Sequence, residues 1–150
     1  MKGDFLPDTD NIARLCGGSH IDPETGSPSP GAFMLKETDN DHVSVNWLEY
    51  LKLPNRSSEI NEVRSVLAKK MSRIGSTSRL AVLNVGQAIE SVKHATGERV
   101  VISVLHLPDF LKDRWDDPSH SGIHGLTLHD DTPAVALAAA VRETHPAKTG

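Results

Sequence analysis

The sequence contains very little cysteine, few aromatic residues and no long hydrophobic run. Its single cysteine, Cys16, excludes a disulfide within the chain and a zinc site built from paired thiolates. Aromatic residues make up 4% of the chain, so aliphatic side chains must form most of the core. The most apolar stretch, PAVALAAAV, is too short to cross a bilayer, and the N-terminal residues lack the apolar segment of a secretory signal. We therefore expect a cytoplasmic protein with no membrane partner.

The composition is typical of one globular domain. A chain of 150 residues can bury a core without metals or disulfides, and its hydrophobic content of 37% separates it from disordered proteins. We predict a single domain over 1–150, with mobile ends at 1–10 and 144–150. The net charge of −4 gives no general attraction to nucleic acid, so binding to nucleic acid would need a local basic patch.

Hydrophobic periodicity and turn residues predict an α+β fold, with a single mixed β-sheet of about five strands and about three helices. The predicted strands are 11–17, 32–37, 42–48, 79–85 and 99–107. The second and third of these should form a hairpin, and the apolar run 99–107 should be a central strand buried on both faces. The predicted helices are 57–75, 86–97 and 132–143. Residues 109–117 should form one turn of helix or a loop, and 116–131 a connecting loop.

The connecting stretch DDPSHSGIHGLTLHDD, residues 116–131, holds three of the eight histidines and four acidic residues. Histidine changes charge near neutral pH, so such a cluster favours proton transfer, phosphate contact or metal binding. His120 and His124 are spaced to share one face of a helix, but Gly122, Gly125 and Pro118 argue against a helix. We consider three interpretations: a solvated polar connection, a catalytic or ligand-binding loop, and a site for zinc or another divalent ion.

The segment RLCGGSHIDPETG offers a second candidate site. Cys16 and His20 could form a nucleophile–base pair, although a lone cysteine beside a strand is more often a small buried residue. Arg14 lies on the preceding strand. Its planar guanidinium could bind a phosphate or carboxylate, or form a surface ion pair.

Alternation in HVSVNWLEY places polar side chains on one face of a strand. His42, Ser44 and Asn46 share that face, whereas Val43 and Val45 face the core. The polar row could line a binding pocket or simply face solvent. The basic run RSVLAKKMSRIGSTSR could provide a nucleic-acid contact or a solvated helix face, and it contains no aromatic residue for base stacking.

Three segments, RLCGGSHIDPETGSPSPGAF, SVNWLEYL and DPSHSGI, resemble a loose set of small uncharacterised bacterial proteins. The resemblance implies no activity, cofactor or catalytic residue. It implies only that the three segments occur together in one fold and surround a common pocket.

Our main hypothesis is a polar site for an anionic ligand, a nucleotide or nucleic-acid phosphate, in a protein that acts as a hydrolase or transferase if it is an enzyme. His120 or His124 would act as general acid or base, with Asp117 orienting the histidine. The predicted ligand-binding residues are Arg14, His20, His42 and Ser44. No metal ligand is assigned and no cofactor is identified, although a divalent metal is possible.

The alternative is a non-catalytic subunit that binds a protein partner in an operon-encoded complex of the toxin–antitoxin or defence type. It depends on Trp115, because a solvent-facing tryptophan beside a charged loop often marks a partner surface.

Overall fold

The computed structural model describes residues 3–71, 73–111 and 115–148. Its main element is a six-stranded sheet in the order β4-β7-β2-β1-β3-β8, and all its described pairings are antiparallel. These strands are β1 (Asn11–Cys16), β2 (His42–Trp47), β3 (Arg79–Asn84), β4 (Ser103–His106), β7 (His120–His124) and β8 (Glu143–Pro146). A second sheet pairs β5 (Asp109–Leu111) with β6 (Trp115–Asp117). The helices are α1 (Arg56–Lys70), α2 (Val85–Ala95) and α3 (Thr132–Ala139).

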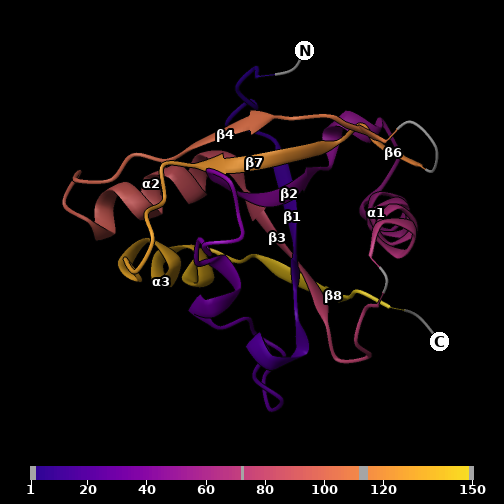
Figure 1. Cartoon of the computed structure of the whole chain (residues 1–150), viewed down its shortest axis with the longest axis horizontal. Helices are drawn as coiled ribbons and strands as arrows, with labels where there is room; N and C mark the ends of the chain where they lie inside the picture. The colour runs from indigo at the N-terminus through magenta and orange to yellow at the C-terminus, as the bar shows by residue number, and fades with distance from the viewer. Residues whose placement is uncertain (1–2, 72, 112–114, 149–150) are drawn as a thin grey trace.

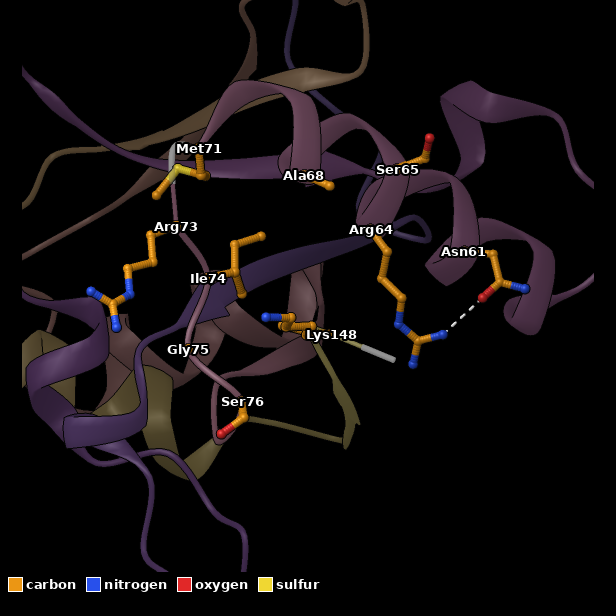
Figure 2. Close-up of a pocket in the computed structure, with 11 residues that line it drawn as sticks. Asn61, Arg64, Ser65, Ala68, Met71, Arg73, Ile74, Gly75, Ser76 and Lys148 are labelled. Carbon is orange, nitrogen blue, oxygen red and sulfur yellow. Dashed lines mark hydrogen bonds between the residues drawn. The ribbon is translucent and has the colours of Figure 1, made fainter. Parts of the chain in front are cut away.

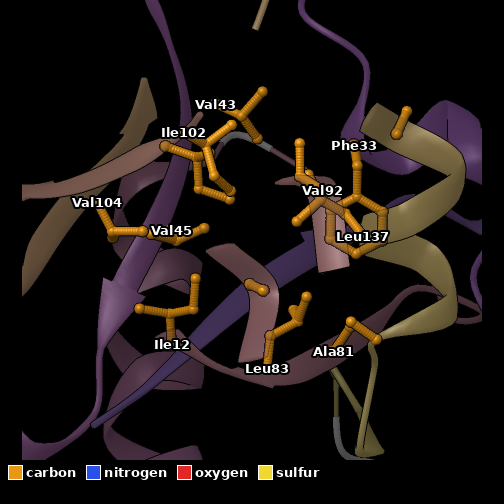
Figure 3. Close-up of a cluster of buried hydrophobic side chains, with 14 of the residues drawn as sticks. Ile12, Phe33, Val43, Val45, Ala81, Leu83, Val92, Ile102, Val104 and Leu137 are labelled. Atoms are coloured by element: carbon orange, nitrogen blue, oxygen red, sulfur yellow. The ribbon is translucent and has the colours of Figure 1, made fainter. Parts of the chain in front are cut away.

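Helices cover the sheet on both faces, α2 and α3 on one and α1 on the other (Figure 1). Successive side chains of a strand therefore enter the cores on opposite faces of the sheet. Ile12 and Cys16 of β1 join the core under α2 and α3, whereas Ala13 packs with the apolar side of α1. Figure 3 shows the larger core, in which Leu137 of α3 and Val92 of α2 pack against strand residues. The aliphatic core predicted from the scarcity of aromatic residues is therefore divided between two faces of one sheet.

The α+β class and the three helices are confirmed. The predicted single mixed sheet is instead an antiparallel sheet of six strands with a separate two-stranded sheet, and two helices end early. The α1 helix ends at Lys70, and Met71, which was predicted to continue it, has extended backbone. The α3 helix ends at Ala139 rather than near residue 143. The Asn55 side chain accepts the Ser58 N–H and caps the start of α1.

Two predictions for individual segments were wrong. Residues Pro30–Phe33 form a 3₁₀ turn in place of the first part of the predicted strand 32–37, and Phe33 is fully buried against α3. No hairpin with 42–48 results, because β2 pairs with β1 and β7. The segment predicted as a helical turn or loop contributes β5 and β6, while residues 112–114 lie outside the described part of the chain.

The largest correction concerns 116–131, which is not a loop leading to the last helix. Its residues 120–124 form β7, which lies inside the sheet between β4 and β2. Ser121 and Ile123 point into the core and are fully buried. Pro118, Gly122 and Gly125 are typical of loops, but pairing on both sides of the strand outweighs these local preferences.

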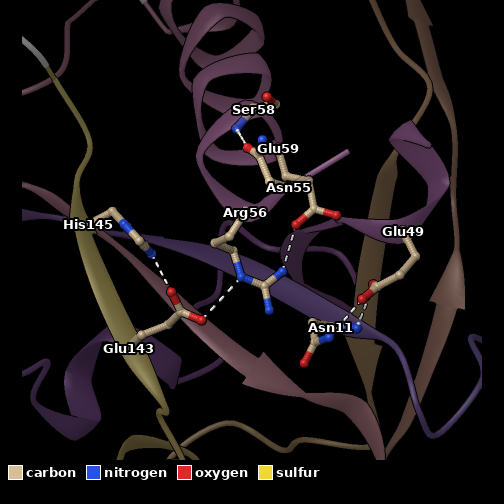
Figure 4. A network of polar contacts seen from close by, with 8 residues as sticks. All are labelled: Asn11, Glu49, Asn55, Arg56, Ser58, Glu59, Glu143 and His145. Atoms are coloured by element: carbon tan, nitrogen blue, oxygen red, sulfur yellow. Dashed lines mark hydrogen bonds and ion pairs between the residues drawn. The ribbon is translucent and has the colours of Figure 1, made fainter. Parts of the chain in front are cut away.

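The strand predicted to be central, β4, lies at the end of the sheet order. Residues near the N-terminus cover its outer edge, since the His106 N–H donates to Asp4 and the Leu6 N–H donates to Val104. At the opposite edge, β8 is joined to α1 by polar contacts (Figure 4). Arg56 Nε donates to Glu143, whose other carboxylate oxygen lies beside His145.

Burial alone would raise the pKa of Glu143, but hydrogen bonds from His145 and Arg56 outweigh it and lower the pKa below its usual value. Across the described helices, none combines the length and apolar character needed to traverse a bilayer.

Candidate functional site

A polar strip runs along β2 and β7 on the face of the sheet that α1 only partly covers. Cross-strand register pairs His42 with His124, Ser44 with Gly122 and Asn46 with His120. Paired residues project to the same side of an antiparallel sheet. The alternation predicted for His42, Ser44 and Asn46 therefore continues on β7, which the sequence analysis treated as a loop.

A cavity of about 500 Å³ opens where this strip meets the C-terminal end of α1. Its lining includes four cationic side chains and no Asp or Glu among the described residues, although the chain as a whole carries a net charge of −4. We call it the basic cavity. The cations are Arg14, Lys36, Lys70 and Arg73, and the polar lining residues are Ser44, Asn46, Ser78 and His120.

Arg14 is fixed at the wall of this cavity by backbone carbonyls. Its Nε donates to Ala32 (2.9 Å), and its Nη1 donates to Ser44 (2.9 Å). These bonds use two of the five guanidinium N–H groups, so the orientation is set while donors remain for a ligand. Burial lowers the pKa of Arg14, and the nearby Cys16 and Asp39 act against that shift.

Lys70 is tied to carboxylates behind the cavity. Its Nζ lies 3.0 Å from Asp117 and 3.5 Å from Asp109. Asp117 is fully buried and also accepts a hydrogen bond from Asn46 (2.8 Å). Asp117 was predicted to orient a catalytic histidine. Its hydrogen bonds described here go instead to Lys70 and Asn46, so its local role is to anchor the end of α1 against the sheet.

His120 contacts Ser44 across the two strands. Its Nδ1 lies 2.8 Å from the carbonyl oxygen of Leu107, and its Nε2 lies 3.1 Å from the Ser44 hydroxyl. A carbonyl only accepts, so Nδ1 carries the proton and Nε2 accepts from Ser44 in the neutral ring. Burial lowers the pKa of His120, which favours this neutral form. The geometry is that of a hydroxyl beside a general base.

A second cavity, of about 740 Å³, adjoins the basic cavity. The two share Met71, Arg73, Ile74 and Gly75, the segment that leaves α1. Figure 2 shows Arg64 on α1, with Lys148 from the C-terminal segment on the side of the helix that faces residues 74–76. Arg64 donates to the Pro146 carbonyl and to Asn61, both neutral acceptors.

Protein-family models, curated proteins and solved structures give no match to this chain. The arrangement of its own side chains is therefore the basis on which function is inferred.

The structure brings together three of the predicted site residues and separates the others. Arg14, Ser44 and His120 line one cavity, whereas His20 packs beside Gly31 and is not among the lining residues. His42 and His124 lie farther along the strip. Their rings are 5.2 Å apart between centroids, and that of His42 lies 5.8 Å from His120.

Two other candidates have different outcomes. Cys16 is fully buried, and its Sγ donates to the Arg14 carbonyl (3.5 Å). Burial raises the pKa of its thiol to about 11, so the alternative of a small buried residue holds and a Cys16–His20 nucleophile pair does not. The side chain of Trp115, on which the partner-binding alternative depends, lies outside the described part of the chain.

The sequence did not predict that Lys36, Met71 and residues 73–75 line the basic cavity. Lys70 and Arg73 were noted as part of a basic run, but a helix through residue 75 would have kept Arg73 on the helix. Two sequence features together could have indicated the cavity. The basic run and the alternating polar residues of β2 both lack acidic residues, so a site formed between them would be positively charged.

Proposed function

We propose that this chain binds a phosphorylated small molecule of about nucleotide size in the basic cavity. The observation that carries the proposal is a cavity with four cationic side chains and no carboxylate in its described lining. A volume of about 500 Å³ lies within the range of about 300–1,000 Å³ that is typical of small-molecule sites. Arginine supplies planar paired donors that match phosphate oxygens, and lysine supplies a compact charge.

The charge of the cavity is only partly neutralised by the protein. Lys70 pairs with Asp109 and Asp117, whereas the hydrogen bonds of Arg14 go to uncharged carbonyls. Within the part of the chain that the structure describes, Arg73 forms no hydrogen bond or ion pair (Figure 2). An anion entering the cavity would therefore meet Arg14 and Arg73, neither of which forms a hydrogen bond or ion pair with a described carboxylate, and this favours binding.

The Ser44–His120 pair supports hydrolysis or transfer as the chemistry of this site. His120 Nε2 would take the Ser44 proton as the hydroxyl oxygen attacks phosphorus. The bond from phosphorus to the leaving oxygen would then break, with the proton returned from His120 to that oxygen. Water would release the phosphoryl group from Ser44 in a second step. Arg14 and Arg73 would stabilise the negative charge on the phosphoryl oxygens.

The test is calorimetric titration of the intact protein with inorganic phosphate, pyrophosphate and AMP. We expect saturable binding of one ligand per chain, weakened by added salt. Arg73→Gln should weaken it about tenfold or more, since a hydrogen bond to a charged group contributes about 1.5–3 kcal/mol. Arg142→Gln is the matched control, because Arg142 is exposed and lines neither cavity.

A further variant distinguishes a small ligand from a polymer. Arg64→Gln alters the second cavity alone, so it should leave AMP binding unchanged. If a single-stranded oligonucleotide binds more tightly than AMP and Arg64→Gln weakens that binding, the ligand is nucleic acid. Absence of saturable binding of all three small anions, or an Arg73→Gln protein that binds like wild type, would reject the proposal.

A further inference from the structure

Asp41, His42 and His124 form a second cluster beside the basic cavity. Asp41 precedes β2, His42 begins that strand, and His124 ends β7 directly opposite His42. One potential ligand atom from each of the three lies within 4.8 Å of the other two. The cluster differs from the His120–His124 pair considered from the sequence. Those two residues lie on one strand, where a separation of four residues spans roughly 13 Å.

A glycine makes room for this arrangement. A Cβ placed on Gly122 would lie 2.6 Å from Cδ2 and 2.7 Å from Cγ of His42. The imidazole therefore occupies the space above Gly122 that any other side chain would fill. This position brings the ring beside His124, at an angle of 32° between the ring planes.

Hydrogen bonding prepares His124 as a ligand. Its Nδ1 lies 3.2 Å from the carbonyl oxygen of Gly122, which can only accept, so this nitrogen carries the proton. In this tautomer Nε2 carries no proton, and it lies 3.5 Å from Asp41 Oδ1. Histidines that bind metals commonly donate their other ring N–H to a carbonyl in this way. Two lone-pair atoms that face each other are stabilised by a cation between them.

The geometry points to a site for a zinc-class divalent ion, and we propose that Asp41, His42 and His124 bind one. Tetrahedral zinc with bonds of about 2.0–2.1 Å to nitrogen and oxygen holds its ligand atoms about 3.4 Å apart. Asp41 Oδ1 lies 2.9 Å from His42 Nδ1, in a hydrogen bond that the ion would replace, and 3.5 Å from His124 Nε2. All three ligand atoms lie within 4.8 Å of one another, so binding requires His42 to move its proton to Nε2 and the three side chains to close around the ion. Three protein ligands leave a fourth position for water, and the exposed Asp41 leaves the site open to solvent.

The experiment is titration of the metal-free intact protein with Zn²⁺ by calorimetry and with Co²⁺ by visible absorption. We expect one ion per chain and the absorption bands of tetrahedral cobalt. Asp41→Ala and His124→Ala should each weaken Zn²⁺ binding by tenfold or more. His94→Ala is the matched control, since His94 is an exposed histidine on α2, away from the cluster, and its removal should change nothing.

The two ligand variants protect the test against misfolding. Asp41 is exposed and lies outside the strand, so Asp41→Ala should keep the wild-type circular dichroism spectrum even if His124→Ala does not. The proposal is overturned if wild type takes up less than one Zn²⁺ per chain at micromolar concentration. It is also overturned if a folded Asp41→Ala protein binds Zn²⁺ as tightly as wild type, which would place the ion elsewhere.

Discussion

At the scale of single residues, Gly122 leaves no room for a side chain, because His42 lies directly against it. Any Cβ there would lie within 2.8 Å of Cβ, Cγ and Cδ2 of His42. A new rotamer could move Cγ and Cδ2, but Cβ can move away only with the backbone. We expect Gly122→Ala to lower the free energy of unfolding by about 1–3 kcal/mol, as overpacking does elsewhere. Urea denaturation measures the change.

Gly17→Ala is the control for that substitution. A Cβ at Gly17 meets no atom within 4 Å, and the residue has φ −63°, which alanine adopts without strain. This variant should be close to wild type in stability. Equal stability of the two alanine variants would show that His42 does not occupy the space above Gly122.

Ser44 and His120 allow the proposed chemistry to be separated from binding. Ser44→Ala and His120→Gln should abolish hydrolysis of p-nitrophenyl phosphate while leaving calorimetric phosphate binding within a few fold, because the cations remain. In wild type the rate should rise with pH as His120 loses its proton and then level off. Since burial lowers the pKa of His120, the midpoint of this rise should lie below the ordinary histidine value of 6.5. A rate that is unchanged in both variants would contradict the assignment.

At the scale of elements, sequence periodicity located the segments whose apolar pattern is regular and failed where contacts between distant segments decide the structure. The β2 strand and the α1 helix carry clear periods of two and of three to four, and both exist. In β7, by contrast, Gly122 is accommodated because His42 fills the space above it, a contact between positions 80 residues apart in the chain. Local preference could not reveal that contact.

The same reasoning explains how much of the site could be predicted. Arg14, Ser44 and His120 could be predicted from local sequence. Arg14 precedes a glycine-rich loop, Ser44 belongs to an alternating polar row, and His120 lies in a histidine cluster. Their convergence on one cavity depends on the pairing of β2 with β7, which the sequence did not show. Lys36 has no neighbouring pattern of that kind, so only the folded chain places it in the basic cavity.

The contact between Lys70 and Asp117 connects α1 to β6 and also limits the positive charge of the basic cavity. Asp117→Asn keeps the shape of the side chain and removes its charge. We expect a loss of about 1–3 kcal/mol in the free energy of unfolding, because a buried hydrogen bond to a charged group is weakened. Phosphate binding should become tighter, since Lys70 is then less neutralised.

Opposite changes in stability and affinity are the expected signature, measured by urea denaturation and calorimetry. Asp116→Asn is the matched control, because Asp116 is the exposed neighbour of Asp117 in the same strand. If Asp117→Asn weakens phosphate binding, Asp117 contributes to the ligand site directly and its role as an anchor alone is wrong.

At the scale of the whole molecule, one sheet supplies both cores, and this arrangement predicts cooperative unfolding. Leu80 packs with α1 on one face and Leu137 of α3 packs on the other, and both are fully buried. The strands β1 and β3 contribute side chains to both cores, so losing one core removes support from the other. Leu80→Ala and Leu137→Ala should each lower the free energy of unfolding by about 2–5 kcal/mol. Both should keep a single transition that coincides by circular dichroism and tryptophan fluorescence.

Val135→Ala is the control, because Val135 is half-exposed on α3, and it should change the free energy of unfolding little. Two separate transitions in either core variant would mean that the faces unfold independently and that the chain is not one cooperative domain.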